Sequence, residues 1–197
     1  MWCRERFLTA EETHRLLKAL DTDENQTAAQ SIKLLLLTGA RRNEITRAKW
    51  EYIDWQNKTL LVPCSKSGRP RLIQLNSAAL ELLRSLPREP ANAFIFPSQI
   101  TGRPSASLHF PWTRIRVRAG LTGLRLHDLR HSFASFLVNK GVSIYVVQGL
   151  LGHANVRATQ RYAHLANETL SDAAELIRAV VLSRASTTSA DPISDAA

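Results

Sequence analysis

The chain has 197 residues, 44% of them hydrophobic and 22% charged, a composition that favours one soluble globular domain over a disordered chain. Lys and Arg number 26 against 17 Asp and Glu, and the net charge of +9 favours a polyanionic partner, with nucleic acid first and an anionic membrane surface a distant second. No apolar run approaches the roughly 20 residues that span a bilayer, and the N-terminal residues lack the apolar stretch of a signal peptide. The two cysteines do not have the spacing of metal ligands. These features indicate a reduced, cytosolic protein.

The first third of the chain predicts three helices. A helix is expected over residues 9–20, because Thr9 and Glu12 form a capping box in front of an apolar pattern. Residues 27–38 are rich in leucine and predict a largely buried helix that ends at the following glycine. The segment 41–50 predicts a third, shorter helix.

The hydrophobic period then changes to that of a small sheet. Residues 59–62 and 70–75 predict two antiparallel strands, and the turn between them, 66–69, carries basic residues at the tip of the hairpin. Helical patterns resume over 77–86 and over 107–119, with proline-rich and glycine-rich loops between them.

The C-terminal third is again helical. Helices are predicted over 126–139 and 143–152, and an amphipathic helix over 167–182. Residues 183–197 are small and polar and predict a disordered tail. The expected fold class is therefore mainly α with a small antiparallel β-sheet, an α+β domain.

Two residues of the 126–139 segment form a candidate phosphate-binding pair. His127 and Arg130 are three positions apart, a spacing that places them on one face of a helix. The Arg guanidinium offers a planar fork of donors to two phosphate oxygens, and the imidazole can donate to a third or move a proton.

The remaining residue types that suit phosphate chemistry fall in a fixed order along the chain. Four local segments carry them: LTGARRNEI (37–45), KSGRPRLIQL (66–75), LHDLRHSF (126–133) and LLGH with the tyrosine nine residues later (150–162). In their order and spacing these segments resemble the catalytic domain of the tyrosine recombinases, the phage integrase family. The six residues that match are Arg41, Lys66, His127, Arg130, His153 and Tyr162.

The resemblance implies a reaction and assigns three residues to the movement of bonds and protons. Tyr162 is expected to be the nucleophile that attacks phosphorus, leaving a 3′-phosphotyrosyl link and a free 5′-hydroxyl. Lys66 is expected to be the general acid that protonates the leaving oxygen, and His127 to help deprotonate the tyrosine.

The resemblance assigns the other matched residues to phosphate binding. Arg41 and Arg130 are expected to clamp its non-bridging oxygens, His153 to hydrogen-bond it, and Glu44 to support Arg41. Because the covalent link conserves the phosphodiester energy, no nucleotide cofactor is implied. The arginines and the lysine supply positive charge, so no metal is implied either.

Each assignment has a structural alternative. Arg42 stands beside Arg41 and is interpreted as a solvated or DNA-backbone charge. Taken alone, Lys66 is a surface turn lysine, His153 a helix cap and Tyr162 a core residue, and only their combination favours function. The other tyrosines, Tyr52 and Tyr145, are not expected to act in the site. Three further histidines are predicted to be structural or solvent-facing: His109, His131 and His164.

The resemblance covers residues from about Phe7 to Leu182. Residues 1–182 are predicted to be the catalytic domain without the family's N-terminal core-binding domain. The expected partners are double-stranded DNA and other protomers, with the 167–182 helix docking in cis or in trans. The leading hypothesis is a site-specific recombinase in a bacterial cytoplasm, associated with the nucleoid. The alternatives are a non-catalytic DNA-binding accessory module of the same fold and a DNA-relaxing enzyme like a type IB topoisomerase.

Overall fold

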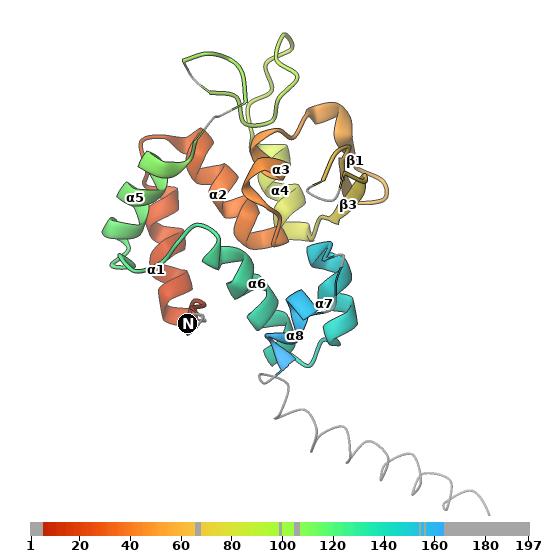
Figure 1. Ribbon diagram of the computed structural model, residues 1–197. Coiled ribbons are helices and arrows are strands. Elements are labelled where there is room, and N and C mark those ends of the chain that lie inside the picture. The colour runs from red at the N-terminus through yellow and green to blue at the C-terminus, as the bar shows by residue number, and fades with distance from the viewer. Residues whose placement is uncertain are drawn as a thin grey trace, which may run out of the picture.

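The computed structural model describes residues 6–65, 68–98, 100–104, 107–153, 155 and 157–163. In these ranges the elements are α1 (Ala10–Asp21), α2 (Gln26–Thr38), α3 (Arg42–Thr46), the 3-10 helix η1 (Trp50–Tyr52), β1 (Ile53–Asp54), β2 (Thr59–Val62), β3 (Arg71–Gln74), α4 (Ser77–Ser85), α5 (His109–Arg118), α6 (Asp128–Asn139), α7 (Ile144–Leu151) and α8 (Arg157–Gln160). The arrangement confirms the predicted class, helices with one small antiparallel sheet (Figure 1).

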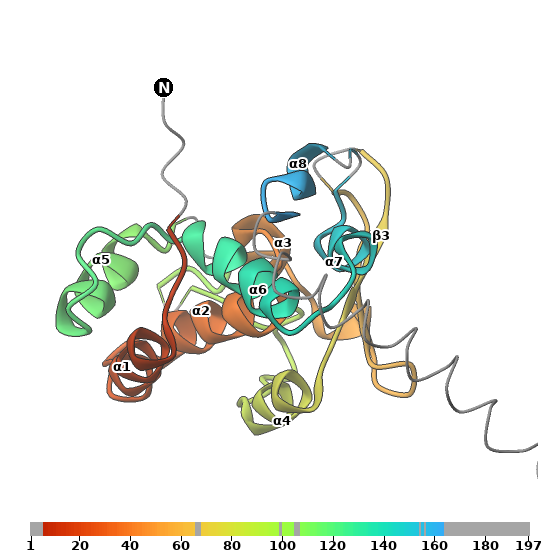
Figure 2. The ribbon, with the colours of Figure 1, turned by 90° about the horizontal axis from the view of Figure 1, so that it is seen from below.

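Helix α2 is the centre of the main core. Its leucine-rich sequence is buried almost all round, and Figure 2 shows it between α1 and α6. Helix α4 packs against it as well. The helix ends as predicted at Gly39, whose φ of 62° places it in the left-handed region. A Cβ at Gly39 would come within 2.4 Å of the Phe133 ring on α6. The end of α2 therefore lies directly against α6, which brings the Gly39 carbonyl to the site described below.

The sheet has three antiparallel strands in the order β1-β2-β3. The predicted hairpin is confirmed, with Leu60 opposite Ile73 and Val62 opposite Arg71. The edge strand β1 was not predicted, because its two residues are too few to establish an alternating pattern. Residues 66 and 67, which include the predicted general acid Lys66, lie outside the described residues.

Helix α6 begins two residues later than the pattern predicts. Asp128 is 1% exposed, and its carboxylate accepts hydrogen bonds from the backbone N–H of Arg125 (2.8 Å) and from the Arg125 guanidinium. These bonds close a turn over residues 125–128, so His127 becomes the N-cap of α6 instead of a residue in its first turn. The apolar pattern of the sequence runs through this turn without marking it.

The C-terminal helices form a second, smaller core. Its members are Ala134 and Val138 of α6, Val147 and Leu151 of α7, and Tyr162 after α8. Helix α7 ends at Gly152 as predicted, although Ser143 at its N-terminus makes no side-chain capping bond. Figure 2 shows α7 beside β3, so the turn after α7 faces both the sheet and the end of α2.

Some sequence predictions fall on the undescribed residues. The helix predicted over 167–182, the tail predicted over 183–197 and His164 lie outside the described residues. Among the helices that the structure describes, none is long and apolar enough to span a membrane.

Candidate active site

Arg130 connects the ends of two helices. It is 4% exposed, and its Nη1 donates to the Gly39 carbonyl after α2 while its Nη2 donates to the Leu151 carbonyl of α7, both at 2.7 Å. Burial, and the neighbouring Arg41, lower the pKa of Arg130 to about 10, so the guanidinium remains charged at neutral pH. Since an arginine has five N–H donors, two carbonyls leave donors for an anion.

Arg41 meets the same turn from another side. Its Nη2 donates to the carbonyl of Gly152 at 3.4 Å, one residue after the carbonyl that Arg130 contacts. Glu44 accepts from the Arg41 backbone N–H (2.8 Å) and from its Nη1 (3.1 Å), the arrangement that the sequence predicts for this pair. Two guanidiniums thus bind adjacent carbonyls, and the positive charge of Arg41 lowers the pKa of Arg130. A bound anion would offset this repulsion between the two cations.

Arg71 is a third arginine in this site, and the sequence analysis missed it. Its Nε and Nη2 donate to Glu44 at 3.1 and 2.7 Å, and its Nη1 donates to the Leu150 carbonyl at 3.2 Å. A signal was available in the alternation of β3, because Ile73 and Leu75 are buried and Arg71 shares their face of the strand. The side chain therefore points into the protein although its residue type suggests a surface position.

His153 lies beside the two clamping arginines. Its Nδ1 is 2.8 Å from the Thr159 hydroxyl, and burial, together with the charges of Arg130 and Arg41, lowers the pKa of His153 to about 4. The ring is therefore neutral at pH 7. If the Thr159 hydroxyl donates to Nδ1, the proton resides on Nε2, and this nitrogen becomes a hydrogen-bond donor.

His127 is exposed at the start of α6, whereas Arg130 is buried. Their solvent exposures therefore differ more than two positions on one helix face would predict. They nevertheless line one hollow of about 250 Å³, together with Arg42. Partial burial of the ring and the nearby Arg130 lower the pKa of His127. The ring of His127 stands edge-on to that of His131, with centroids 5.0 Å apart.

Tyr162 is buried in the second core, and its hydroxyl has a partner that the sequence analysis set aside. The Tyr162 oxygen lies 2.5 Å from Nδ1 of His131, and the tyrosine is 5% exposed. Burial and the neighbouring His127 lower the pKa of His131 to about 4, so the ring is neutral at pH 7. With the ring proton on Nε2, Nδ1 accepts a hydrogen bond from the phenol. The sequence analysis predicts His131 to be structural or solvent-facing, whereas the structure places it in contact with the candidate nucleophile. Spacing alone does not reveal this contact, because Tyr162 arrives from another element.

The structure thus gathers most of the predicted residues around the turn after α7. Arg41, Glu44, Arg130 and His153 meet there, and Tyr162 is linked to His127 through His131. Lys66 lies outside the described residues, so its position relative to the turn stays a prediction.

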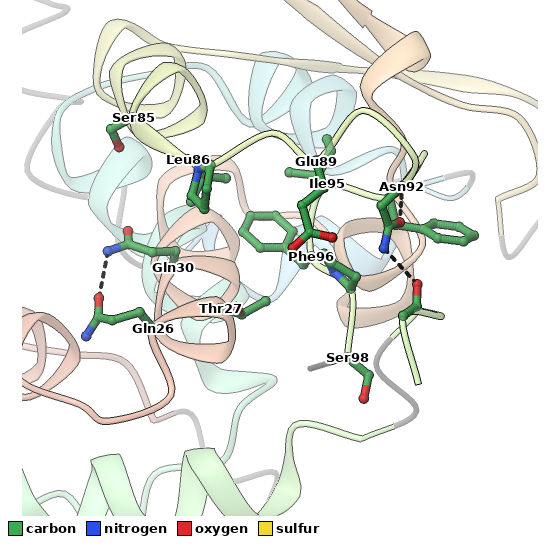
Figure 3. Close-up of a pocket in the computed structure, with 14 residues that line it drawn as sticks. Gln26, Thr27, Gln30, Ser85, Leu86, Glu89, Asn92, Ile95, Phe96 and Ser98 are labelled. Carbon is green, nitrogen blue, oxygen red and sulfur yellow. Dashed lines mark hydrogen bonds between the residues drawn. The ribbon is translucent and has the colours of Figure 1, made fainter. Parts of the chain in front are cut away.

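A larger hollow elsewhere in the fold is not this site. It has a volume of about 480 Å³ and lies between α2, the end of α4 and the loop that follows (Figure 3). Amide and hydroxyl side chains such as Gln26, Asn92 and Thr27 line it, with Ile95 and Phe96 as its apolar wall. None of its described lining residues is cationic, and none belongs to the predicted set, so its chemistry does not suit a phosphodiester.

The lowered histidine pKa values predict acid sensitivity. A histidine with a lower pKa in the folded state binds fewer protons there than in the unfolded chain, so acid favours unfolding. The stability that His131 and His153 contribute is therefore fully present above the ordinary pKa of 6.5 and is lost as the pH falls towards 4. The melting temperature is expected to fall between pH 6.5 and 4.5, above the range in which the lowered pKa of Glu44 acts. In His131→Asn, which keeps an acceptor for Tyr162 but does not titrate, the fall should be shallower. Equal slopes for both proteins would contradict this assignment.

Two guanidiniums, a neutral imidazole and a buried phenol form a site for one anion and one nucleophilic attack upon it. The guanidiniums match the non-bridging oxygens of a phosphodiester, and the phenol with its histidine acceptor matches a nucleophile with a proton acceptor. Among the described residues, no group of His, Cys, Asp and Glu has the arrangement of a metal site.

Comparison with known proteins gives a consistent result. The model of the phage integrase family matches residues 6–169. The integrase of Salmonella phage P22 is 31% identical over 191 residues, which cover 90% of this chain and 48% of that protein. The integrase of Escherichia phage P2 is 35% identical over 171 residues, which cover 86% of this chain and 46% of that protein. The chain therefore spans about half the length of these relatives.

Solved structures share the fold. The XerH site-specific recombinase in its post-cleavage complex with palindromic difH substrate superposes with a TM-score of 0.69 at 29% identity, covering 88% of this chain and 54% of that one. The catalytic domain of bacteriophage HP1 integrase superposes with a TM-score of 0.67 at 26% identity, covering 86% of this chain and 93% of that one. The match thus extends over nearly the whole of the HP1 integrase catalytic domain.

Proposed function

We infer the function of this chain from its family: it belongs to the phage integrase family, the tyrosine recombinases. We propose that it cleaves and rejoins strands of double-stranded DNA through a 3′-phosphotyrosyl intermediate. The observation that carries the proposal is the pair of arginines on the adjacent carbonyls of Leu151 and Gly152, next to the buried tyrosine. A phosphodiester placed on this pair has its two non-bridging oxygens opposite two guanidiniums.

The proposed reaction exchanges one phosphorus–oxygen bond for another. The Tyr162 oxygen forms a bond to phosphorus as the bond to the 5′ oxygen breaks, and Arg41 and Arg130 stabilise the charge that grows on the non-bridging oxygens. The phenol proton passes to a histidine, His127 or the adjacent His131, and the departing 5′ oxygen receives a proton from Lys66. His153 donates to the phosphate. Attack by a 5′-hydroxyl on the phosphotyrosyl link reverses these steps and rejoins the strand.

The proposed partners follow from charge and from the reaction. The net charge of +9 suits the DNA backbone. Strand exchange needs more than one active site, so other protomers on the same DNA are proposed partners, with the predicted helix 167–182 docking in cis or in trans. A bacterial cytoplasm, in association with the nucleoid, is the location proposed for this chemistry.

Two alternatives are distinct from site-specific recombination. A DNA-binding module without catalysis has no need of Tyr162 held against His131, and the presence of this pair favours the enzyme. A DNA-relaxing enzyme uses the same chemistry without a preferred sequence, and relaxation of a supercoiled plasmid that lacks any selected site would identify it.

The experiment that tests the proposal is covalent capture on DNA of random sequence. A library of nicked duplexes with a randomised centre is incubated with the chain, and adducts that survive denaturation are recovered and sequenced. Adducts enriched for one sequence, formed through Tyr162, support the recombinase. Adducts without sequence preference favour the topoisomerase-like alternative. Binding without any adduct favours the accessory module.

Lys66→Ala is expected to slow adduct formation by about 10²–10⁴-fold, the usual contribution of a positioned general acid. The defect should disappear on the same DNA with sulfur in place of the 5′ bridging oxygen, because a thiolate leaves without protonation. Arg69→Ala, a charge removed from the same hairpin turn, serves as the control and should lack this substrate-dependent rescue. A defect of Lys66→Ala that persists with the sulfur substrate assigns the acid to another residue.

A further inference from the structure

Three consecutive carbonyls at the end of α7 each accept a hydrogen bond from a different arginine. Arg71 donates to the carbonyl of residue 150, Arg130 to that of 151 and Arg41 to that of 152. The last carbonyls of a helix have no intrahelical partner and carry partial negative charge, so cations are stabilised there. The three guanidiniums converge on one turn, immediately before His153.

Glu44 is a carboxylate that pairs with two of these arginines, Arg41 and Arg71. Its side chain is 5% exposed and forms ion pairs with Arg71 at 2.7 Å and Arg41 at 3.1 Å. Although burial alone would raise it, the pKa of Glu44 is lowered by the hydrogen bonds from Arg71 and Arg41. The carboxylate is therefore ionised, and with three arginines the group carries a net charge of +2.

The two ion pairs of Glu44 differ in kind. Arg71 binds it with both Nε and Nη2, a bidentate fork, and its third contact is a backbone carbonyl. Arg41 uses one side-chain nitrogen and one backbone N–H, and its side chain is more exposed, 26% against 11% for Arg71. Arg71 is thus engaged within the protein, while Arg41 stays accessible to an external anion.

The difference between Arg71, which is engaged with Glu44, and Arg41, which stays accessible, affects the charge available to a phosphodiester. Without Arg71 the buried carboxylate would pair with Arg41 alone and cancel the charge that the phosphate needs. A phosphodiester carries one negative charge, and more negative charge develops on its non-bridging oxygens in the transition state. The positive charges of both Arg41 and Arg130 must therefore remain available to the phosphate and not be cancelled by Glu44.

We propose that Arg71 is a positioning residue that neutralises Glu44, so that the carboxylate orients Arg41 without cancelling its charge. The proposal rests on the function proposed above. Arg71 acts through Glu44 and the turn before His153 and does not touch the phosphate. Gly152 belongs to the same arrangement, because a Cβ there would come within 2.7 Å of Nη1 of Arg71.

Charge-altering variants separate this role from packing. Arg71→Met retains much of the side-chain volume and lowers the net charge of the group to +1, Glu44→Gln raises it to +3, and the double variant restores +2. The rate of adduct formation is measured on a duplex captured by the wild-type chain. Arg71→Met is expected to be slower than wild type by on the order of 10²-fold, comparable to the loss of one oxyanion donor. The double variant should be at least about tenfold faster than Arg71→Met.

The decisive measurement compares two scissile groups, the phosphodiester and a methylphosphonate, whose methyl group removes one negative charge. If Arg71 acts by neutralising the charge of Glu44, Arg71→Met should cleave the methylphosphonate less than about tenfold more slowly than wild type does. If Arg71 only packs the turn, both substrates slow equally, and the proposal is overturned. It is also overturned if Arg71→Met cleaves the phosphodiester as fast as wild type. An absence of adducts with wild-type protein on every duplex refutes the proposed function instead, which keeps the two failures distinct.

Discussion

Tyr162→Phe is expected to form no covalent adduct on any duplex that the wild-type chain captures. Phenylalanine lacks the oxygen that attacks phosphorus, so the loss is complete and not a reduction in rate. The ring itself should stay where it is, because Tyr162 packs against Ala134, Val138 and Leu151 in the second core. The measurement is the fraction of DNA that remains attached to protein after denaturation.

The control for this variant is non-covalent. Tyr162→Phe should bind the same DNA with unchanged affinity, and its free energy of unfolding should fall by only about 1 kcal/mol, the usual cost of one lost hydrogen bond, here the one to His131. Tyr145→Phe removes the hydroxyl of an exposed tyrosine and should retain full activity. Adducts formed by Tyr162→Phe would move the nucleophile elsewhere in the chain.

Arg130→Lys is expected to reduce the rate of adduct formation by roughly 10²–10³-fold while the chain remains charged at this position. A lysine ammonium cannot bridge the Gly39 and Leu151 carbonyls and also offer a planar fork to a phosphate. The defect should lie in the chemical step, measured as the rate at saturating DNA, because positive charge, and with it much of the binding to the DNA backbone, is retained.

Arg118→Lys is the matched control for the structural part of this effect. Arg118 also donates to two backbone carbonyls, those of Ala19 and Thr22, and to the buried carboxylate of Asp23. It is the last residue of α5, which lies on the opposite side of the molecule from α7 (Figure 1). Both substitutions should lower the melting temperature, but only Arg130→Lys should slow cleavage. An equal loss of cleavage in both variants would mean that Arg130 acts through stability alone.

Much of the fold was predictable because its signals are local. The capping box at Thr9, the leucine-rich α2 and the glycines that end α2 and α7 act within a few residues, so their patterns predicted element types and ends. The start of α6 was missed because it depends on the side chain of Asp128 folding back onto Arg125, which competes with the helical pattern at that point. The edge strand β1 forms only because β2 is there to pair with it.

The candidate site likewise has features that local sequence signals predict and features that depend on the tertiary structure. The order of residue types along the chain was enough to indicate the family, the candidate arginines for phosphate binding and the candidate tyrosine. The pairing of Arg71 with Glu44 and the contact of His131 with Tyr162 became visible only in the folded chain. These contacts join residues that are 27 and 31 positions apart in the sequence and lie on separate elements. A local sequence pattern therefore cannot predict them. A buried charge or phenol takes its partner from whatever surface packs against it, and that surface exists only once the helices and the sheet have assembled.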